Sequence, residues 1–246
     1  MSKTIFGIIG GAGVKASNEL MKRIENTVTD MGAYRDFHHP EIILWQATSS
    51  PSRSMYLEGK GPSFIEDYIS IAKNLKSSGA SYIFMCCNTA HYAIEQIKKE
   101  VKIKVINLLE ETVKTLKKDF LDYKNVGLLC SDGTKKHKLY DKYFNKIYSG
   151  VNIIYPEDDF QKFVTDGICK VKDRNDMTPA NVSFHKAINH LKDKGANMIV
   201  IVCTDISLAL GNKDFDIPYL DTTDVLKNTL LKIWQEKEKL KFKRKI

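Results

Sequence analysis

Two cysteines occupy matching positions in two similar stretches of this chain. Cys87 ends an apolar stretch that begins with Gly79-Ala80, and Cys203 ends one that begins with Gly195-Ala196. A lysine-rich amphipathic segment precedes each copy, at 68–78 and 184–194. Parallel α/β units place functional groups at the carboxyl ends of their strands. We therefore expect the two thiols to flank one small substrate.

A thiol at the junction of a strand and a helix is suited to acid-base chemistry. Helix amides stabilise a thiolate, and a modest stabilisation yields a base that works near neutral pH. Two thiols facing each other can remove a proton from one side of a carbon atom and return one to the other side. The remaining cysteines, Cys86, Cys130 and Cys169, are predicted to be packing residues.

Groups that bind carboxylates stand close to both cysteines. Asn88, Thr89 and Thr204 offer amide and hydroxyl groups where helices begin, although Asn and Thr are also ordinary helix caps. Arg53 lies in a polar loop predicted over 48–62, and a guanidinium matches a carboxylate with two parallel hydrogen bonds. The glycine turn that contains Gly11 is expected to expose backbone N–H groups to an anion.

Apolar strand-like segments alternate with amphipathic helical segments along the chain. This alternation predicts an α/β fold with mostly parallel sheets and helices on both faces. The duplication predicts two similar lobes related by a pseudo-two-fold axis, with the active site in the cleft between them. We expect residues 1–100 plus 207–246 to form the first lobe and residues 101–206 the second. A strand is predicted over 105–108 and one continuous helix over 135–148.

The sequence argues against a dinucleotide site and against a metal site. The segment 11–16 fits G-x-G-x-x-A, the fingerprint of dinucleotide-binding proteins. The next strand ends in Leu44-Trp45-Gln46 without an acid to hold a ribose, which argues against a nicotinamide-dependent oxidoreductase. The histidines show no metal-ligand spacing, so no metal is expected. His91 follows the first cysteine and either tunes it or lies on a helix surface.

Composition narrows the class of protein. The chain has 246 residues, 43% of them hydrophobic, enough for a packed core without a membrane-spanning run. Five cysteines, an odd number without CxxC pairs, favour a reducing, cytoplasmic location. Much of the net charge of +8 comes from the tail at 236–246, which is predicted to be a solvated helix end. Binding of nucleic acid or membranes is not expected.

Several motifs together resemble the aspartate/glutamate racemase family, and specifically its aspartate racemase branch, which uses no cofactor. The resemblance runs from the first strand to beyond the second cysteine. It rests on 8–13 (IIGGAG), His39-Pro40, 51–53 (PSR), 59–61 (GKG), 87–91 (CNTAH), 110–112 (EET), Gly133-Thr134 and 203–205 (CTD).

The resemblance implies roles for individual residues. Cys87 and Cys203 would be the acid-base pair, and Asn88, Thr89 and Thr204 would bind the α-carboxylate. Gly11 and Thr134 belong to motifs placed at the substrate. Arg53 would bind the side-chain carboxylate together with a lysine late in the second lobe, either Lys172 or, without a one-residue deletion, Lys170. The resemblance also implies a homodimer and no pyridoxal phosphate.

The chain departs from the family pattern at four positions. Cys86 stands where a proline is common, Val202 where a glycine precedes the second cysteine, Asp205 where a glutamate is usual, and Ala12 where a methionine is frequent. Glutamate racemases typically open with Asp-Ser-Gly and have His after the second Cys-Thr, and this chain has neither. We therefore expect an aspartate racemase that acts by two-base proton transfer, with relaxed aspartate/glutamate racemisation or silent binding of acidic amino acids as alternatives. Hydantoin racemases and maleate isomerases share the cysteine pair but fit the 87–91 segment less well.

Overall fold

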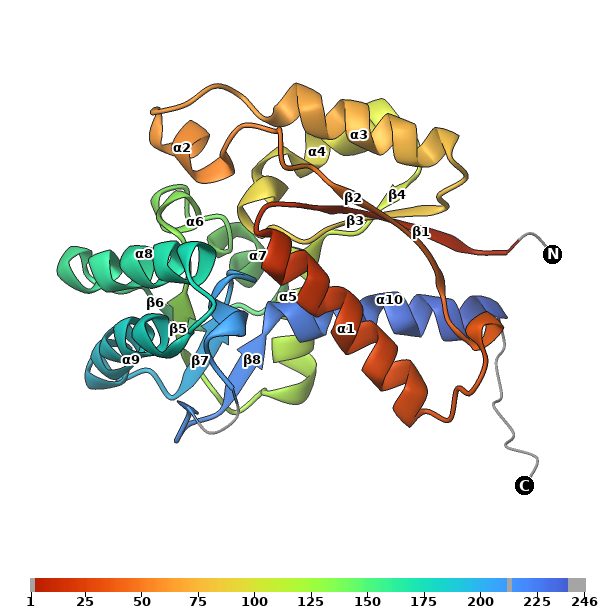
Figure 1. Ribbon diagram of the computed structural model, residues 1–246. Helices are drawn as coiled ribbons and strands as arrows, with labels where there is room; N and C mark the ends of the chain where they lie inside the picture. Colours follow the sequence, from red (N-terminus) through yellow and green to blue (C-terminus); the bar gives the residue numbers. More distant parts are fainter. Residues whose placement is uncertain (1–2, 212–213, 239–246) are drawn as a thin grey trace.

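The computed structural model describes residues 3–211 and 214–238 and contains two parallel four-stranded sheets (Figure 1). The first sheet has the strand order β2-β1-β3-β4, and the second has the order β6-β5-β7-β8. Each half therefore arranges its successive strands in the same order. The strands are β1 (Ile5–Gly10), β2 (Glu41–Gln46), β3 (Tyr82–Met85), β4 (Lys104–Val105), β5 (Asn125–Leu129), β6 (Asn152–Ile154), β7 (Met198–Ile201) and β8 (Tyr219–Asp221). The predicted α/β class with two similar lobes is confirmed.

Helices connect the parallel strands. They are α1 (Val14–Asp30), α2 (Arg53–Glu58), α3 (Ile65–Ser77), α4 (Ile94–Val101), α5 (Leu108–Asp119), α6 (Asp132–Lys136), α7 (Asp141–Ile147), α8 (Asp158–Asp173), α9 (Thr178–Asp193) and α10 (Thr222–Glu238). Short 3₁₀ turns are η1 (Asp36–His38), η2 (Thr89–Ala93) and η3 (Ile206–Leu208). Within the described ranges, no helix is long and apolar enough to span a bilayer.

The duplication extends to the packing of single residues. Gly7 on β1 is paired with Ile83 on β3, and a Cβ at Gly7 would come within 2.9 Å of the Ile83 Cδ1. Gly127 on β5 is paired with Ile199 on β7 and would make the same 2.9 Å approach. Each glycine thus leaves room for an isoleucine on the strand that leads to a cysteine.

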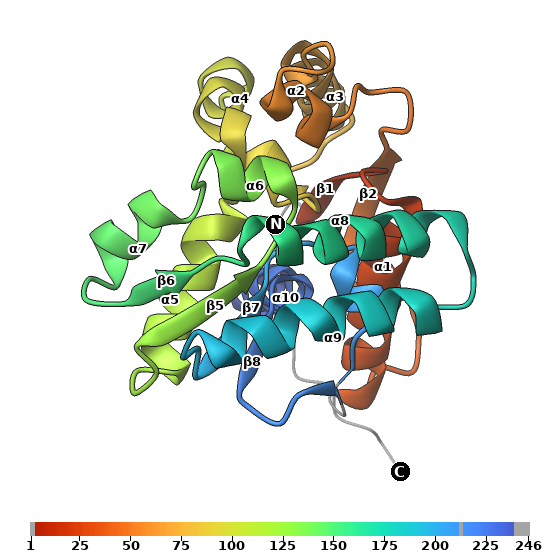
Figure 2. The ribbon, with the colours of Figure 1, turned by 90° about the vertical axis from the view of Figure 1, so that its left-hand side faces the viewer.

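Three apolar clusters form the interior. α3 and α4 cover the outer face of the first sheet, and α8 and α9 lie side by side over the outer face of the second (Figure 2). The largest cluster lies between the sheets, where α1, α5 and α10 meet both inner faces. Burial of large side chains such as Phe6, Phe84 and Trp234 drives the association of the two halves.

Sheet membership does not follow the predicted residue division at two strands. β4 lies in the first sheet although it follows residue 100, and β8 lies in the second sheet although it follows residue 206. α10 packs against both α1 and α5. In each half, the last strand pairs with the strand before it in the same sheet, β4 with β3 and β8 with β7. The chain therefore passes to the other half only after that strand.

Three local predictions were wrong. The loop expected over 48–62 contains α2, whose Ser52 side chain accepts a hydrogen bond from the Met55 amide as an N-cap. The strand expected over 105–108 ends at Val105, because α5 begins at Leu108. The helix expected over 135–148 is split into α6 and α7 around Lys138, which has a φ of 45°. Most of the basic tail, 239–246, lies outside the described residues.

Candidate active site

The two cysteine loops leave their sheets at equivalent points. The Cys86 amide donates to Ile9 O of the neighbouring strand at 3.0 Å, and the Val202 amide donates to Leu129 O at 2.9 Å. Cys87 and Cys203 follow directly, both half-buried. They line one cavity between the two sheets, together with Ala12, Ser52, Arg53, Ser54, Asn88, Thr89, Ser131, Ile168, Lys172, Val202, Thr204 and Asp205. The structure therefore brings the two thiols to a single site.

The surroundings of Cys203 hold it as a neutral thiol. Burial raises the pKa of Cys203 to about 12, and the nearby Asp205 carboxylate adds to this rise. A backbone hydrogen bond at Asp205 and the ammonium of Lys172 oppose it. A buried thiol with a raised pKa is a proton donor near neutral pH. Cys86 and Cys130 are buried as predicted, and burial also raises their pKa values. The prediction that Cys169 is a packing residue was wrong, because its side chain is exposed on α8.

His91 is buried and contacts the backbone of the first cysteine loop, so it does not lie on a surface. It is 1% exposed, and its Nε2 accepts a hydrogen bond from the Leu108 amide at 3.1 Å. The Nδ1–H therefore donates to Cys87 O at 2.9 Å. Burial lowers the pKa of His91 to about 4. This neutral tautomer fixes the Cys87 backbone against the start of α5.

Protonation of His91 is expected to destabilise the fold in mild acid. Its pKa is about 4 when folded and about 6.5 when unfolded, so the unfolded chain binds more protons between these values. The free energy of unfolding should therefore fall by about 3 kcal/mol as the pH drops from 6.5 to 4. Urea titrations at several pH values test this on the wild type and on His91→Gln, which cannot titrate. An equally steep pH dependence in the variant would contradict the assignment.

Hydroxyl groups from both halves meet at Thr89. Its Oγ1 lies 2.9 Å from Ser131 Oγ and 3.1 Å from Thr134 Oγ1. Thr89 and Ser131 line the cavity, whereas Thr134 is fully buried behind them. Thr134 thus orients Thr89 and has no place on the cavity wall. Sequence reasoning missed Ser131, although its place two residues after β5, at the carboxyl end of a central strand, was a signal.

Asn88 and Thr204 differ in how they are held. Asn88 is 2% exposed, and its Nδ2 donates to Thr222 Oγ1 at 3.0 Å while its Oδ1 accepts from Tyr140 at 2.5 Å. Its side chain does not cap η2. The Thr204 hydroxyl has no hydrogen-bond partner among the described residues, although the side chain is 5% exposed and lines the cavity. It is therefore available to a ligand.

Arg53 begins α2 and lines the cavity. Its Nη1 donates to Pro51 O at 2.9 Å, while its buried Nε has no partner in the described part of the chain. The guanidinium carbon lies 6.0 Å from the centre of the Tyr68 ring, whose buried hydroxyl is likewise unpartnered. A buried donor without a partner is costly, so the arrangement favours a bound acceptor at Arg53.

The structure distinguishes the two candidate lysines on α8. Lys172 lines the cavity, and its Nζ lies 3.4 Å from Asp205 Oδ2. Burial alone would lower the pKa of Lys172, but Asp205 and the two cavity cysteines raise it above its usual value. Lys170 instead contacts Asp166 and Ser183, outside the cavity. Lys15 on α1 donates to Val171 O at 3.0 Å and so ties this end of α8 to the first half.

The amide of Gly11 in the glycine turn is hydrogen-bonded within the protein. The Gly11 amide donates to Ser17 Oγ at 2.9 Å, so it is not free to bind an anion as expected. Gly11 lines a neighbouring hollow that shares Arg53, Lys172 and Asp205 with the cavity. Gly13, with a φ of 100°, lies against the Asp205 carboxylate. No cluster of three or more potential metal ligands occurs within 3–211 and 214–238.

Comparison with known proteins identifies the family. The model of the Asp/Glu/hydantoin racemase family matches residues 9–230. A broad specificity amino-acid racemase, RacX of Bacillus subtilis (strain 168), is 22% identical over 225 residues, covering 90% of this chain and 94% of that protein. An aspartate racemase of Picrophilus torridus has a TM-score of 0.82 and 27% identity over 94% of both chains. A Francisella tularensis glutamate racemase solved with D-glutamate, at 15% identity, shares the fold with a TM-score of 0.63 over 98% of this chain and 84% of that one.

The family match covers most of the chain, and the solved relatives share its two-sheet architecture. The predicted resemblance to the aspartate racemase branch agrees with the similarity to the Picrophilus protein. The chain therefore belongs to the Asp/Glu/hydantoin racemase family.

Proposed function

We propose that the protein interconverts L- and D-aspartate by moving a proton at Cα between Cys87 and Cys203, without pyridoxal phosphate. The observation that carries this proposal is the placement of both thiols, from equivalent strand ends, on the wall of one cavity. A racemase needs a base on one face of the carbon and an acid on the other. The raised pKa of Cys203 suits it to be the acid in the resting protein.

The polar groups around the thiols fit the two carboxylates of the substrate. Asn88, Thr89 and Thr204 would bind the α-carboxylate, where negative charge accumulates as the Cα proton leaves. Arg53 and Lys172, both on the cavity wall, would bind the side-chain carboxylate. The Asp205 carboxylate, 3.4 Å from Lys172 Nζ, would hold this ammonium in place on the cavity wall.

A wider substrate range is the second candidate, because the relative in B. subtilis is a broad specificity amino-acid racemase. A racemisation assay with aspartate, glutamate, alanine and leucine, read by chiral chromatography, separates the two candidates. Fastest conversion of aspartate supports the proposal. Comparable rates for alanine and leucine would replace it with the broader activity, and turnover of none of the four would leave a binder of acidic amino acids.

Arg53→Met tests the assignment of the side-chain carboxylate. Loss of a charge-assisted hydrogen bond costs about 1.5–3 kcal/mol, so kcat/KM for aspartate should fall about 10- to 150-fold. Any turnover of alanine should be unchanged, since alanine has no second carboxylate. Arg174→Met is the matched control, because it removes an exposed guanidinium whose one ion pair among the described residues is with Asp173. An unchanged preference for aspartate in Arg53→Met would contradict the role.

A further inference from the structure

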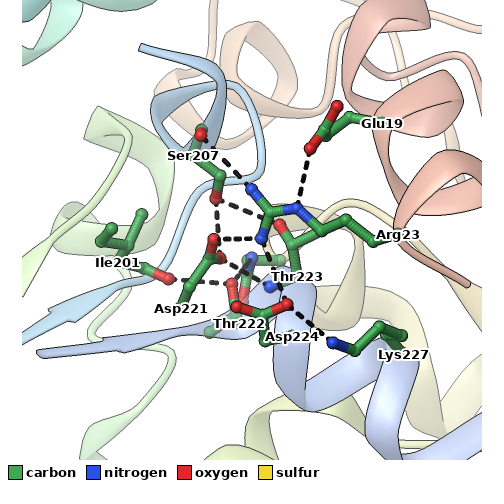
Figure 3. A network of polar contacts seen from close by, with 10 residues as sticks. Glu19, Arg23, Ile201, Ser207, Asp221, Thr222, Thr223, Asp224 and Lys227 are labelled. Atoms are coloured by element: carbon green, nitrogen blue, oxygen red, sulfur yellow. Dashed lines mark hydrogen bonds and ion pairs between the residues drawn. The ribbon is translucent and has the colours of Figure 1, made fainter. Parts of the chain in front are cut away.

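The junction between β8 and α10 lies between the two cysteine loops. Its residues Asp221, Thr222 and Thr223 are 5%, 0% and 1% exposed. None of them lines the cavity. Buried polar side chains require partners, and those of the junction are found on both cysteine loops and on α1. Figure 3 shows the contacts with Ile201, Ser207 and Arg23. No local sequence pattern indicates this arrangement, because the contacts span up to 198 positions.

One hydroxyl of the junction joins the two cysteine segments directly. Thr222 Oγ1 accepts a hydrogen bond from Asn88 Nδ2 at 3.0 Å and donates to Ile201 O at 2.9 Å. Asn88 follows Cys87, and Ile201 is the last residue of β7, two positions before Cys203. A hydroxyl has one proton to donate, so this pair of bonds fixes its orientation. The bridge therefore sets the distance from the first loop to the strand that carries the second thiol.

The other two junction residues hold the second loop. Ser207 lies four positions after Cys203, and its Oγ donates to Asp221 Oδ1 at 2.7 Å and lies 3.1 Å from Thr223 Oγ1. The Thr223 amide donates to the same Asp221 oxygen at 2.8 Å. The first half has a counterpart, since His91 lies four positions after Cys87 and receives the Leu108 amide at the start of α5.

An arginine from α1 neutralises the charge of the junction. Arg23 Nη1 lies 2.7 Å from Asp221 Oδ2, and its Nη2 donates to Ser207 O at 3.5 Å (Figure 3). Arg23 also contacts Glu19 at 2.9 Å and Asp224 at 3.3 Å. Buried charges are tolerated when they are paired and hydrogen-bonded, and Asp221 meets both conditions. The ion pair thus anchors the junction to the helix that follows β1.

We propose that the β8–α10 junction is the positioning element that sets the separation and the relative orientation of the two thiols. This inference rests on the proposed two-cysteine racemisation. Thr222 positions the Cys87 loop through Asn88, and Asp221 positions the Cys203 loop through Ser207. Both act through other residues, since neither touches the cavity.

Thr222→Val is the most direct variant, because it keeps the volume and removes both hydrogen bonds. A misplacement of about 1 Å in an active site costs about 10²-fold in rate, so we expect kcat to fall about 30- to 100-fold. Thr222→Ser keeps the hydroxyl and should stay within about threefold of the wild type. Thr229→Val is the matched control, because it removes a threonine hydroxyl whose hydrogen bond among the described residues is to Val225 O in the same helix. Wild-type kcat in a folded Thr222→Val would overturn the proposal.

A second readout follows each thiol separately and requires no turnover. Alkylation by iodoacetamide, quantified by peptide mass spectrometry across pH, reports the reactivity of Cys87 and Cys203, with the exposed Cys169 as internal reference. Thr222→Val should change the rate at Cys87 by about fivefold or more, and Ser207→Ala should do so at Cys203, because each loop opens more readily. Ser207→Ala also serves if Thr222→Val does not fold. Unchanged rates at Cys87 in Thr222→Val and at Cys203 in Ser207→Ala would overturn the proposal.

The two readouts separate failure of this inference from failure of the proposed function. If the wild type racemises aspartate and the variants match it in rate and in thiol reactivity, the junction has no positioning role. If the wild type does not exchange the Cα proton of any acidic amino acid, the function is wrong, and the alkylation profiles still decide whether the junction controls the two loops.

Discussion

Cys87→Ser and Cys203→Ser each abolish interconversion of L- and D-aspartate in our account, lowering the rate by about 10³- to 10⁴-fold. General acid-base groups contribute about 10²- to 10⁴-fold, and both thiols are required in every turnover, because one removes the Cα proton and the other delivers a proton to the opposite face. A serine hydroxyl is similar in size to a thiol but is a far weaker acid, so the fold should persist while proton transfer stops.

Each single variant should still exchange the Cα proton of one enantiomer. In Cys203→Ser, Cys87 retains the ability to remove a proton from the enantiomer that faces it and to return a deuteron to the same face. Exchange without inversion is the expected signature. Cys169→Ser, at an exposed position on α8, and Cys130→Ser, at a buried position after β5, are controls for the loss of a thiol as such. Full racemisation by either active-site variant would exclude the two-base mechanism.

Gly13→Ala is the second substitution with a large expected effect. Gly13 has a φ of 100°, a conformation that costs an alanine about 1–3 kcal/mol. A Cβ at this position would overlap Asp205 Oδ1 and come within 3.0 Å of its Cγ. Asp205 would move, and its ion pair with Lys172 on the cavity wall would break. We expect kcat/KM to fall about 10²-fold from this displacement.

Gly150→Ala separates backbone strain from displacement of Asp205. Gly150 has a φ of 82°, and a Cβ there would meet no atom within 4 Å. Both variants should lose about 1–3 kcal/mol of unfolding free energy in urea titrations, whereas only Gly13→Ala should lose activity. Equal kcat/KM values in the two variants would show that the contact between Gly13 and Asp205 does not contribute to activity.

The duplication made much of the fold predictable from the sequence. Alternating apolar segments indicated the parallel strands, and the matching positions of Cys87 and Cys203 indicated two strand ends that face one cavity. Both conclusions depend on local patterns that repeat. The short helix α2 was missed because its six residues, Arg53–Glu58, are too few for helical periodicity to show.

The support around the site was not predictable, because it is made by long-range contacts. His91 was expected either to tune the cysteine or to lie on a surface, yet it is buried against the start of α5. The Gly11 amide was expected to bind an anion, yet Ser17 occupies it. Arg23 and Asp221 carry no motif, and only the folded chain brings them together. Homodimerisation and the cytoplasmic location stay predictions.

Proton NMR of L-aspartate incubated with the protein in deuterium oxide under reducing conditions follows exchange at Cα and inversion in one experiment. We expect loss of the Cα proton signal together with formation of D-aspartate by the wild type, and no D-aspartate with Cys87→Ser or Cys203→Ser. Absence of Cα exchange with both aspartate and glutamate in the wild type, or unchanged formation of D-aspartate in both variants, would contradict the proposed function.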